Sequence, residues 1–299
     1  MTPTSRFEGP IACPFVQRQP AWTGSSLGAP YGIDGNLSSN NLRPKQAYRG
    51  QARTAFSVAL SGPLRHLPVL IIGDVHGDIE RLSSALQPYP ADEWRTIFLG
   101  DLVDYGSSGI ACLRLARDRT NTDVLLGNHE AAMLSALGDA SRVSFYMRIG
   151  GNYHDLDELR MDEELQDWLK ARPLVLKLGD GTLVQHCGND DYRLLLGEER
   201  SDPVGTINNH GRLVLEAGDA HLLWDVMSGT GVFATQPDRL ERWLELTGSR
   251  RVVFGHTPHH EPTPAHYHGG RAINYDGGLS RAHYRRAAPI AASVGPLPP

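Results

Sequence analysis

The sequence has few cysteines, no basic cluster and no long apolar run, and each absence narrows the possible classes of protein. Its three cysteines are too few and too irregularly spaced for a disulfide framework or a zinc knuckle. No run of Lys and Arg stands out and the formal net charge is -5, so we expect neither nucleic acid nor a membrane surface as a partner. No apolar stretch approaches a membrane span, and residues 1–10 lack the regions of a signal peptide. We therefore expect a soluble, cytoplasmic protein.

The 299 residues divide by composition into three segments. Residues 1–67 are rich in Pro, Gly, Ser and Asn and have few apolar residues at helical or strand spacing, which indicates a partly irregular extension. Residues 68–286 have the mixed composition of one globular domain. Residues 287–299 are rich in Ala and Pro and are predicted to form a flexible tail.

Short apolar runs alternate with amphipathic stretches through the first half of that domain. Each run is rich in β-branched and aliphatic residues and ends in Gly followed by a polar residue, which is typical of buried strands. The runs cover 68–73, 95–100 and 122–127. Helical spacing follows each run, over 78–86, 109–118 and 129–137. This βαβ alternation predicts an α/β fold with a mainly parallel sheet.

The second half of the domain is predicted to contribute one more helix and a second set of strands. Leucines and a tryptophan at helical spacing predict a single helix over 155–171. The strand-like runs cover 174–178, 182–186, 251–255 and 271–275.

Polar side chains follow the predicted strands at the point where each strand ends. Asp74 and His76 follow the first run, and because they are two residues apart in extended chain they point the same way and can bind one ion. Asp101 follows the second run and Asn128 the third. Open α/β folds place their sites at this edge of the sheet, so we expect these side chains to lie together.

Two histidines complete the pattern, because His186 and His256 end two of the later runs. A lone polar residue after a strand is usually a cap or a surface group, but five strand ends that each finish in Asp, Asn or His predict a shared site. Carboxylate, imidazole and amide ligands suit borderline metals such as manganese, iron or zinc.

These motifs, in this order, resemble the calcineurin-like metallophosphoesterase superfamily over about residues 68–284. They are most similar to the phosphoprotein phosphatase branch, because that branch shares Gly127-Asn128-His129-Glu130, Leu222-Leu223-Trp224-Asp225 and the Thr257-Pro258 that follows His256. The resemblance implies a calcineurin-like four-layer α/β/β/α sandwich with the dimetal site at the C-terminal ends of the strands.

The resemblance also implies a ligand set for two divalent cations, with manganese as the first choice and iron or zinc as alternatives. One cation is assigned to Asp74, His76 and Asp101, and the other to Asp101, Asn128, His186 and His256. Asp101 then bridges the two. Such a pair can share a hydroxide that attacks phosphorus and can stabilise the phosphoryl oxygens.

His129 adjoins the ligand Asn128, so it is expected at the rim of the metal pair, where it can protonate the leaving alkoxide as a general acid. Asp104 is expected to hold its other ring nitrogen. The alternative is that His129 only donates a hydrogen bond to support the site.

One position departs from the phosphatase branch. That branch usually has an arginine that holds a substrate phosphate oxygen where this chain has Tyr105. A phenol donates one hydrogen bond and has no charge, so other residues must bind the substrate phosphate. Arg148, Arg193 and Arg212 are candidate substrate residues that the sequence does not rank.

The resulting hypothesis is a phosphomonoesterase that acts on a phosphoprotein or a phosphorylated small metabolite. A nucleotide or dinucleoside polyphosphate pyrophosphohydrolase is the alternative, although the similar symmetrical dinucleoside tetraphosphate hydrolases generally lack an acidic residue at the position of Asp104. A catalytically silent metal-binding interaction module is the non-enzyme alternative, and the complete ligand set argues against it. The oligomeric state stays open.

Overall fold

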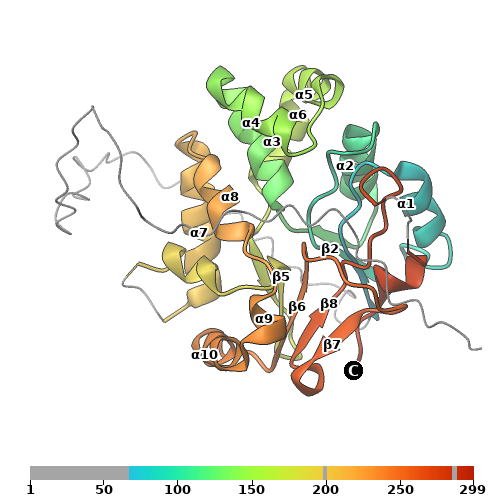
Figure 1. Cartoon of the computed structure of the whole chain (residues 1–299), viewed down its shortest axis with the longest axis vertical. Coiled ribbons are helices and arrows are strands. Elements are labelled where there is room, and N and C mark those ends of the chain that lie inside the picture. Colours follow the sequence, from blue (N-terminus) through green and yellow to red (C-terminus); the bar gives the residue numbers. More distant parts are fainter. Residues whose placement is uncertain (1–66, 198–200, 285–287) are drawn as a thin grey trace, which may run out of the picture. The chain divides into compact units, whose positions relative to one another are not determined.

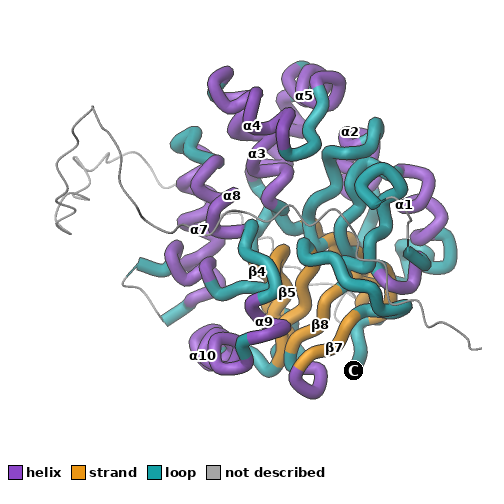
Figure 2. The backbone as a smooth tube through the Cα atoms, in the orientation of Figure 1, coloured by secondary structure: helices purple, strands orange, loops and turns teal. Residues whose placement is uncertain are grey.

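The computed structural model describes residues 67–197, 201–284 and 288–299, and the described chain is built around two β-sheets (Figures 1 and 2). The predicted extension over residues 1–67 lies outside the described residues apart from its last residue. The strands are β1 (Val69–Ile72), β2 (Arg95–Phe98), β3 (Thr122–Val124), β4 (Val175–Lys177), β5 (Thr182–Cys187), β6 (Arg251–Gly255), β7 (Ala265–Tyr267), β8 (Ala272–Asn274) and β9 (Val294–Pro296).

Helices connect these strands and cover the sheets. The α-helices are α1 (Ile79–Leu86), α2 (Gly109–Asp118), α3 (Asn128–Gly138), α4 (Val143–Arg148), α5 (Tyr153–Arg160), α6 (Glu163–Lys170), α7 (Pro203–Glu216), α8 (His221–Met227), α9 (Val232–Thr235) and α10 (Pro237–Thr247). Short 3₁₀ helices are η2 (Ala140–Arg142), η3 (Asp191–Leu195), η4 (His268–Gly270) and η5 (Ile290–Ala292).

The two sheets have parallel centres and antiparallel edges. The first has the order β3-β2-β1-β9, with β1, β2 and β3 parallel and β9 antiparallel to β1. The second has the order β4-β5-β6-β8-β7, with β5, β6 and β8 parallel and the two outer strands antiparallel to them. The carboxyl ends of the parallel strands therefore lie at one edge of each sheet, where the polar residues follow.

Successive side chains of a strand point to opposite faces of its sheet, and this explains how the layers pack together. In β1, Ile71 belongs to a small core between the two sheets, whereas Leu70 and Ile72 belong to the larger core under the helices. The core between the sheets is made of Ile71, Ile97, Leu99, Leu125, Leu178, Val184, Val253, Ile273 and Tyr275. Figure 1 shows α1 and α2 on one flank and α7, α8 and α10 on the other. The predicted four-layer α/β/β/α arrangement is confirmed.

Two expectations differ from the structure. The single helix predicted over 155–171 is wrong, because the chain breaks between α5 and α6, and Asp162 caps α6 by accepting a hydrogen bond from the Leu165 N–H at 3.0 Å. The predicted flexible tail is wrong for residues 288–299, because Val294 and its neighbours form β9, whose backbone pairs with β1. That pairing completes the hydrogen bonds of β1, which is otherwise open on this side.

No helix in the described ranges is long and apolar enough to cross a bilayer. Cys112 and Cys187 are buried free thiols, and burial raises the pKa of each to about 12, which fits packing rather than reactivity.

Candidate metal centre

The predicted ligands come together where the strands end. Asp74 follows β1, Asp101 follows β2, His186 lies near the end of β5 and His256 follows β6. Each of these four side chains offers one ligand atom, and the four atoms lie within 4.8 Å of one another. A second group with the same spacing is formed by His76, Asp101 and His129. Asp101 belongs to both groups, as expected of a bridging carboxylate.

Strained backbone at the strand ends aims these side chains inward. His76, Asp101 and His256 have φ angles of 45°, 53° and 65°, in the left-handed region that non-glycine residues rarely adopt. Each such residue costs on the order of 1–3 kcal/mol. Gly127 shows how tight the site is, because a Cβ there would lie 2.2 Å from Oδ1 of Asp101.

Glu130 holds this strained turn in place. Its carboxylate accepts hydrogen bonds from the backbone N–H groups of Asp101 at 2.8 Å, Leu102 at 2.6 Å and Val103 at 3.3 Å. It also accepts one from the N–H of Gly127 at 2.9 Å. One buried side chain on α3 therefore joins the turn after β2 to the turn after β3, and it offsets part of the strain.

His186 is held with Nε2 facing Asn128 and Asp101. Its Nδ1 lies 2.9 Å from the carbonyl oxygen of Leu99, and its Nε2 lies 2.7 Å from Oδ1 of Asn128 and 3.4 Å from Oδ2 of Asp101. Burial opposes a charged ring, but the carboxylate of Asp101 raises the pKa of His186. A proton on Nε2 thus sits where a cation would be shared with Asn128 and Asp101, while the Leu99 carbonyl fixes the ring.

Burial lowers the pKa of the other two candidate imidazoles, His76 and His256, which keeps them neutral. His76 directs Nδ1 to the carbonyl oxygen of Val103 at 3.2 Å, so its Nε2 remains available at the candidate metal centre. Burial and the neighbouring His186 lower the pKa of His256 to about 3. The backbone N–H of His256 donates to both carboxylate oxygens of Asp74, at 3.0 and 3.1 Å. Neutral imidazole is the form that binds metal.

The buried charge fits divalent cations. Burial raises the pKa of Asp74 well above its usual range, with Asp276 and Asp101 adding repulsion, and burial raises the pKa of Asp276 to about 7. Buried carboxylates in such numbers need compensating positive charge. The Nδ2 of Asn128 is also buried without a hydrogen-bond partner among the described residues, so this amide can donate to a bound oxygen atom, whereas Oδ1 is its only atom suited to a cation. The buried carboxylates at or next to the centre are Asp74, Asp101, Asp104, Glu130 and Asp276.

His129 and Asp104 form the expected pair. Nδ1 of His129 lies 2.7 Å from Oδ2 of Asp104, and the Tyr146 hydroxyl donates to Oδ1 of Asp104 at 2.7 Å. Burial lowers the pKa of His129, but the charge of Asp101 and the hydrogen bond to Asp104 outweigh burial and raise it to about 9. Nε2 of His129 faces the centre, 3.9 Å from Oδ2 of Asp101.

The four candidate substrate residues lie in different parts of the structure. Tyr105 lies at the centre, with its ring centroid 4.9 Å from that of His76. Arg148 lies over the ring of Phe145, at 5.8 Å from its centroid. Arg193 is beside two aspartates, and Arg212 pairs with an acidic residue on its own helix. The described contacts therefore place neither Arg193 nor Arg212 at the centre.

Four residues at the centre escaped prediction. Asp276 follows β8 after one intervening residue, so the rule that picked out the candidate ligands after the other strands applied to it as well. His283 and Tyr284 come from the loop after it, which has no regular pattern, and their rings contact each other at 4.3 Å. Trp224 on α8 contacts His129 at 5.5 Å between ring centroids.

Carboxylates, imidazoles and an amide gathered at the C-terminal edge of two facing sheets define a candidate metal centre on an α/β/β/α fold. The family model for calcineurin-like phosphoesterase matches residues 67–260, which is more than half of the chain. The chain belongs to the calcineurin-like phosphoesterase family. The expected phosphoric ester hydrolase is thereby confirmed at the level of the family, and the family implies a dimetal site.

Several curated relatives are named as symmetrical bis(5'-nucleosyl)-tetraphosphatases. The chain is 30% identical over 125 residues to that of Actinobacillus pleuropneumoniae serotype 5b, covering 40% of this chain and 44% of the relative. It is 34% identical over 126 residues to that of Methylococcus capsulatus, covering 41% and 43%. The chain thus spans less than half the length of these relatives.

The fold is similar to a crystal structure titled cold-active protein-tyrosine phosphatase of a psychrophile Shewanella species. The TM-score is 0.56 at 17% identity, covering 80% of this chain and 85% of that chain. At this identity the likeness supports the fold.

Proposed function

We propose that the protein hydrolyses phosphate monoesters and that its own residues supply both the metal ligands and the proton for the leaving group. The observation that carries this proposal is the buried hydrogen bond of 2.7 Å between His129 and Asp104, with Nε2 of His129 directed at the centre. A hydrolase of alkyl phosphates needs such an acid, because an alkoxide is a poor leaving group unless it is protonated.

Two cations are assigned by the resemblance to the family, which divides the clustered side chains differently from their spacing alone. Asp74, His76 and Asp101 would hold one, and Asn128, His186 and His256 would hold the other, with Asp101 shared. When bound, the cations activate water and neutralise the phosphoryl oxygens. Manganese is proposed first, with iron or zinc as alternatives, because the donors are oxygens and imidazoles and the thiol of Cys187 is not among them.

His129 is assigned as the general acid. Asp104 accepts a hydrogen bond from Nδ1–H of His129 and Tyr146 holds the other oxygen of Asp104, so the imidazole is fixed in orientation. Because the charge of Asp101 and the hydrogen bond to Asp104 raise the pKa of His129 to about 9, Nε2 also carries a proton. Bound cations repel an imidazolium and lower its pKa from the high value in the metal-free centre, which makes proton release easier.

Hydrolysis of a dinucleoside polyphosphate is the second candidate, and the names of the curated relatives favour it. The leaving group of that reaction is a phosphate, which departs without strong acid assistance. The His129–Asp104 pair has less to do in that reaction, so we place phosphomonoesters first. A cytoplasmic location remains a prediction.

Steady-state kinetics on the manganese-loaded protein tests whether phosphate monoesters or dinucleoside polyphosphates are the better substrates. The panel contains a phosphopeptide, a sugar phosphate, a nucleoside monophosphate and a dinucleoside tetraphosphate, and Asp101→Asn serves as the metal-deficient control. We expect the highest kcat/KM on a monoester. A higher value on the tetraphosphate, lost in the control variant, would make the polyphosphate its substrate.

A further inference from the structure

One imidazole at the metal centre has no place in the ligand groups or in the pair formed by His129 and Asp104. The ring centroid of His283 lies 4.5 Å from that of His76 and 3.9 Å from that of Tyr105. The residue is partly exposed, and its ring nitrogens have no hydrogen-bond partner among the described residues. An N–H group beside the centre is therefore free to bind a ligand.

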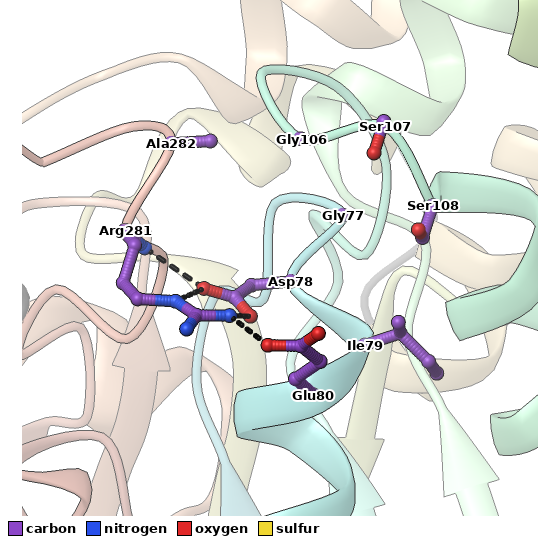
Figure 3. Close-up of a pocket in the computed structure, with 9 residues that line it drawn as sticks. All are labelled: Gly77, Asp78, Ile79, Glu80, Gly106, Ser107, Ser108, Arg281 and Ala282. Carbon is purple, nitrogen blue, oxygen red and sulfur yellow. Dashed lines mark hydrogen bonds and ion pairs between the residues drawn. The ribbon is translucent and has the colours of Figure 1, made fainter.

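Among the described residues, the arginine nearest to this imidazole in sequence is Arg281, and its guanidinium is already engaged. The guanidinium of Arg281 donates to Asp78 through Nε at 3.0 Å and Nη2 at 2.9 Å, and to Glu80 at 2.7 Å. Figure 3 shows it turned toward these two carboxylates in the pocket beside α1. Two carboxylates neutralise its charge, so Arg281 does not replace the arginine that the phosphatase branch has at the position of Tyr105.

Arg281 instead anchors the loop that carries His283. Asp78 caps α1 and lies two residues after His76, so its bond to Arg281 ties the loop to the first metal-binding motif. The Ser280 hydroxyl donates to the carbonyl oxygen of His76 at 3.1 Å. These two contacts fix the loop just before His283.

A third contact fixes the loop just after His283. The Tyr284 hydroxyl donates to Asp276 at 3.2 and 3.3 Å, and the carboxylate of Asp276 is fully buried. The imidazole of His283 is thus held from both sides and does not depend on its own hydrogen bonds for its position.

Tyr105 is fixed beside the imidazole of His283. Its backbone N–H donates to the Gly150 carbonyl oxygen at 2.8 Å, and its ring packs so closely on Gly150 that a Cβ there would lie 2.6 Å from it. The residue is 40% exposed. The phenol and the imidazole of His283 therefore form a closely packed pair, with their rings tilted by 40°, that borders the centre on the side of His76.

We propose that His283, together with Tyr105, binds the phosphoryl oxygens of the substrate in place of the missing arginine. This rests on the proposed function, because it assumes a phosphate group held at the metal pair. Imidazole and phenol each donate one hydrogen bond, so two side chains supply what one guanidinium supplies elsewhere. His283 is a phosphate-binding residue and not a metal ligand.

Calorimetric titration of inorganic phosphate into the manganese-loaded protein tests this. We expect His283→Ala to weaken phosphate binding by about 10- to 100-fold, the loss typical of one hydrogen bond to a charged group. His283→Gln keeps an N–H donor and should recover part of the loss, and Tyr105→Phe should weaken binding less than His283→Ala. His154→Ala is the matched control, because that side chain is 77% exposed on α5 and should leave binding unchanged.

Manganese content and kinetics separate the possible outcomes. The manganese content should stay at the wild-type level in every variant, and in His283→Ala the KM for an aryl phosphate should rise more than kcat falls. Unchanged phosphate affinity in His283→Ala and His283→Gln, or loss of manganese from either, would overturn the proposal. If the wild type hydrolyses no phosphomonoester while His283→Ala still weakens phosphate binding, the proposed function fails and the assignment of His283 stands.

Discussion

Nδ1 of His129 lies 2.7 Å from the carboxylate of Asp104, and the Tyr146 hydroxyl donates to the second oxygen of that carboxylate. His129 and Asp104 are almost fully buried, and they come from different segments, since His129 lies in the first turn of α3 and Asp104 in the loop after β2. The imidazole is thus fixed in one orientation with Nε2 toward the metal centre.

This geometry predicts the effect of His129→Asn. The variant should keep both metals but lose about 100- to 10,000-fold in turnover of an alkyl phosphate, because the leaving alkoxide is no longer protonated. An aryl phosphate with a good leaving group should suffer less, and Asp104→Asn should show the same ranking. Equal losses on both substrates would make His129 a positioning residue.

Asp101→Asn should remove metal from both ligand groups. Asp101 contributes to each group, and a neutral amide compensates the mutual repulsion of two cations poorly. Elemental analysis after desalting should find well under half of the wild-type metal content. Content near the wild-type value would show that Asp101 does not bridge.

Glu130→Ala should destabilise the protein by at least about 3 kcal/mol, because it leaves four buried backbone N–H groups without their acceptor. Urea unfolding of the manganese-free protein measures this without a contribution from metal binding. Glu216→Ala is the control, since its exposed ion pair with Arg212 contributes at most about 1 kcal/mol. Similar losses in both variants would mean that Glu130 does not support the turn after β2.

Tyr105→Arg should lower kcat/KM for the natural substrate by about tenfold, because it removes the ring contact with His283 and the contact with Gly150. Turnover of a phosphoserine or phosphothreonine peptide should stay low. Tyr153→Arg, at a tyrosine that is 61% exposed, controls for the added charge. A large gain on the phosphopeptide would contradict the phosphate-binding role proposed for His283 and Tyr105.

Much of the centre could be predicted from sequence because its ligands follow strands that are themselves easy to recognise. Asp74, Asp101 and His256 each come just after an apolar run, and parallel strands bring their carboxyl ends to one edge. For these residues, the local sequence pattern is therefore enough to predict that they lie close together in the fold.

Other parts could not be predicted because they depend on contacts between distant segments. His283 reaches the centre through an irregular loop held by Asp78, some 200 residues earlier. The short strand β9 shows only as an Ala/Pro-rich tail in the sequence, and its pairing with β1 is a tertiary contact. The break between α5 and α6 rests on a single capping residue, Asp162, inside an apolar pattern that continues across it.

Anomalous diffraction from crystals grown with manganese tests the central claim most directly. Two anomalous peaks are expected, one bounded by Asp74, His76 and Asp101 and the other by Asp101, Asn128, His186 and His256. Both peaks should weaken in Asp101→Asn crystals. A single peak, or peaks away from these residues, would contradict a dimetal centre bridged by Asp101.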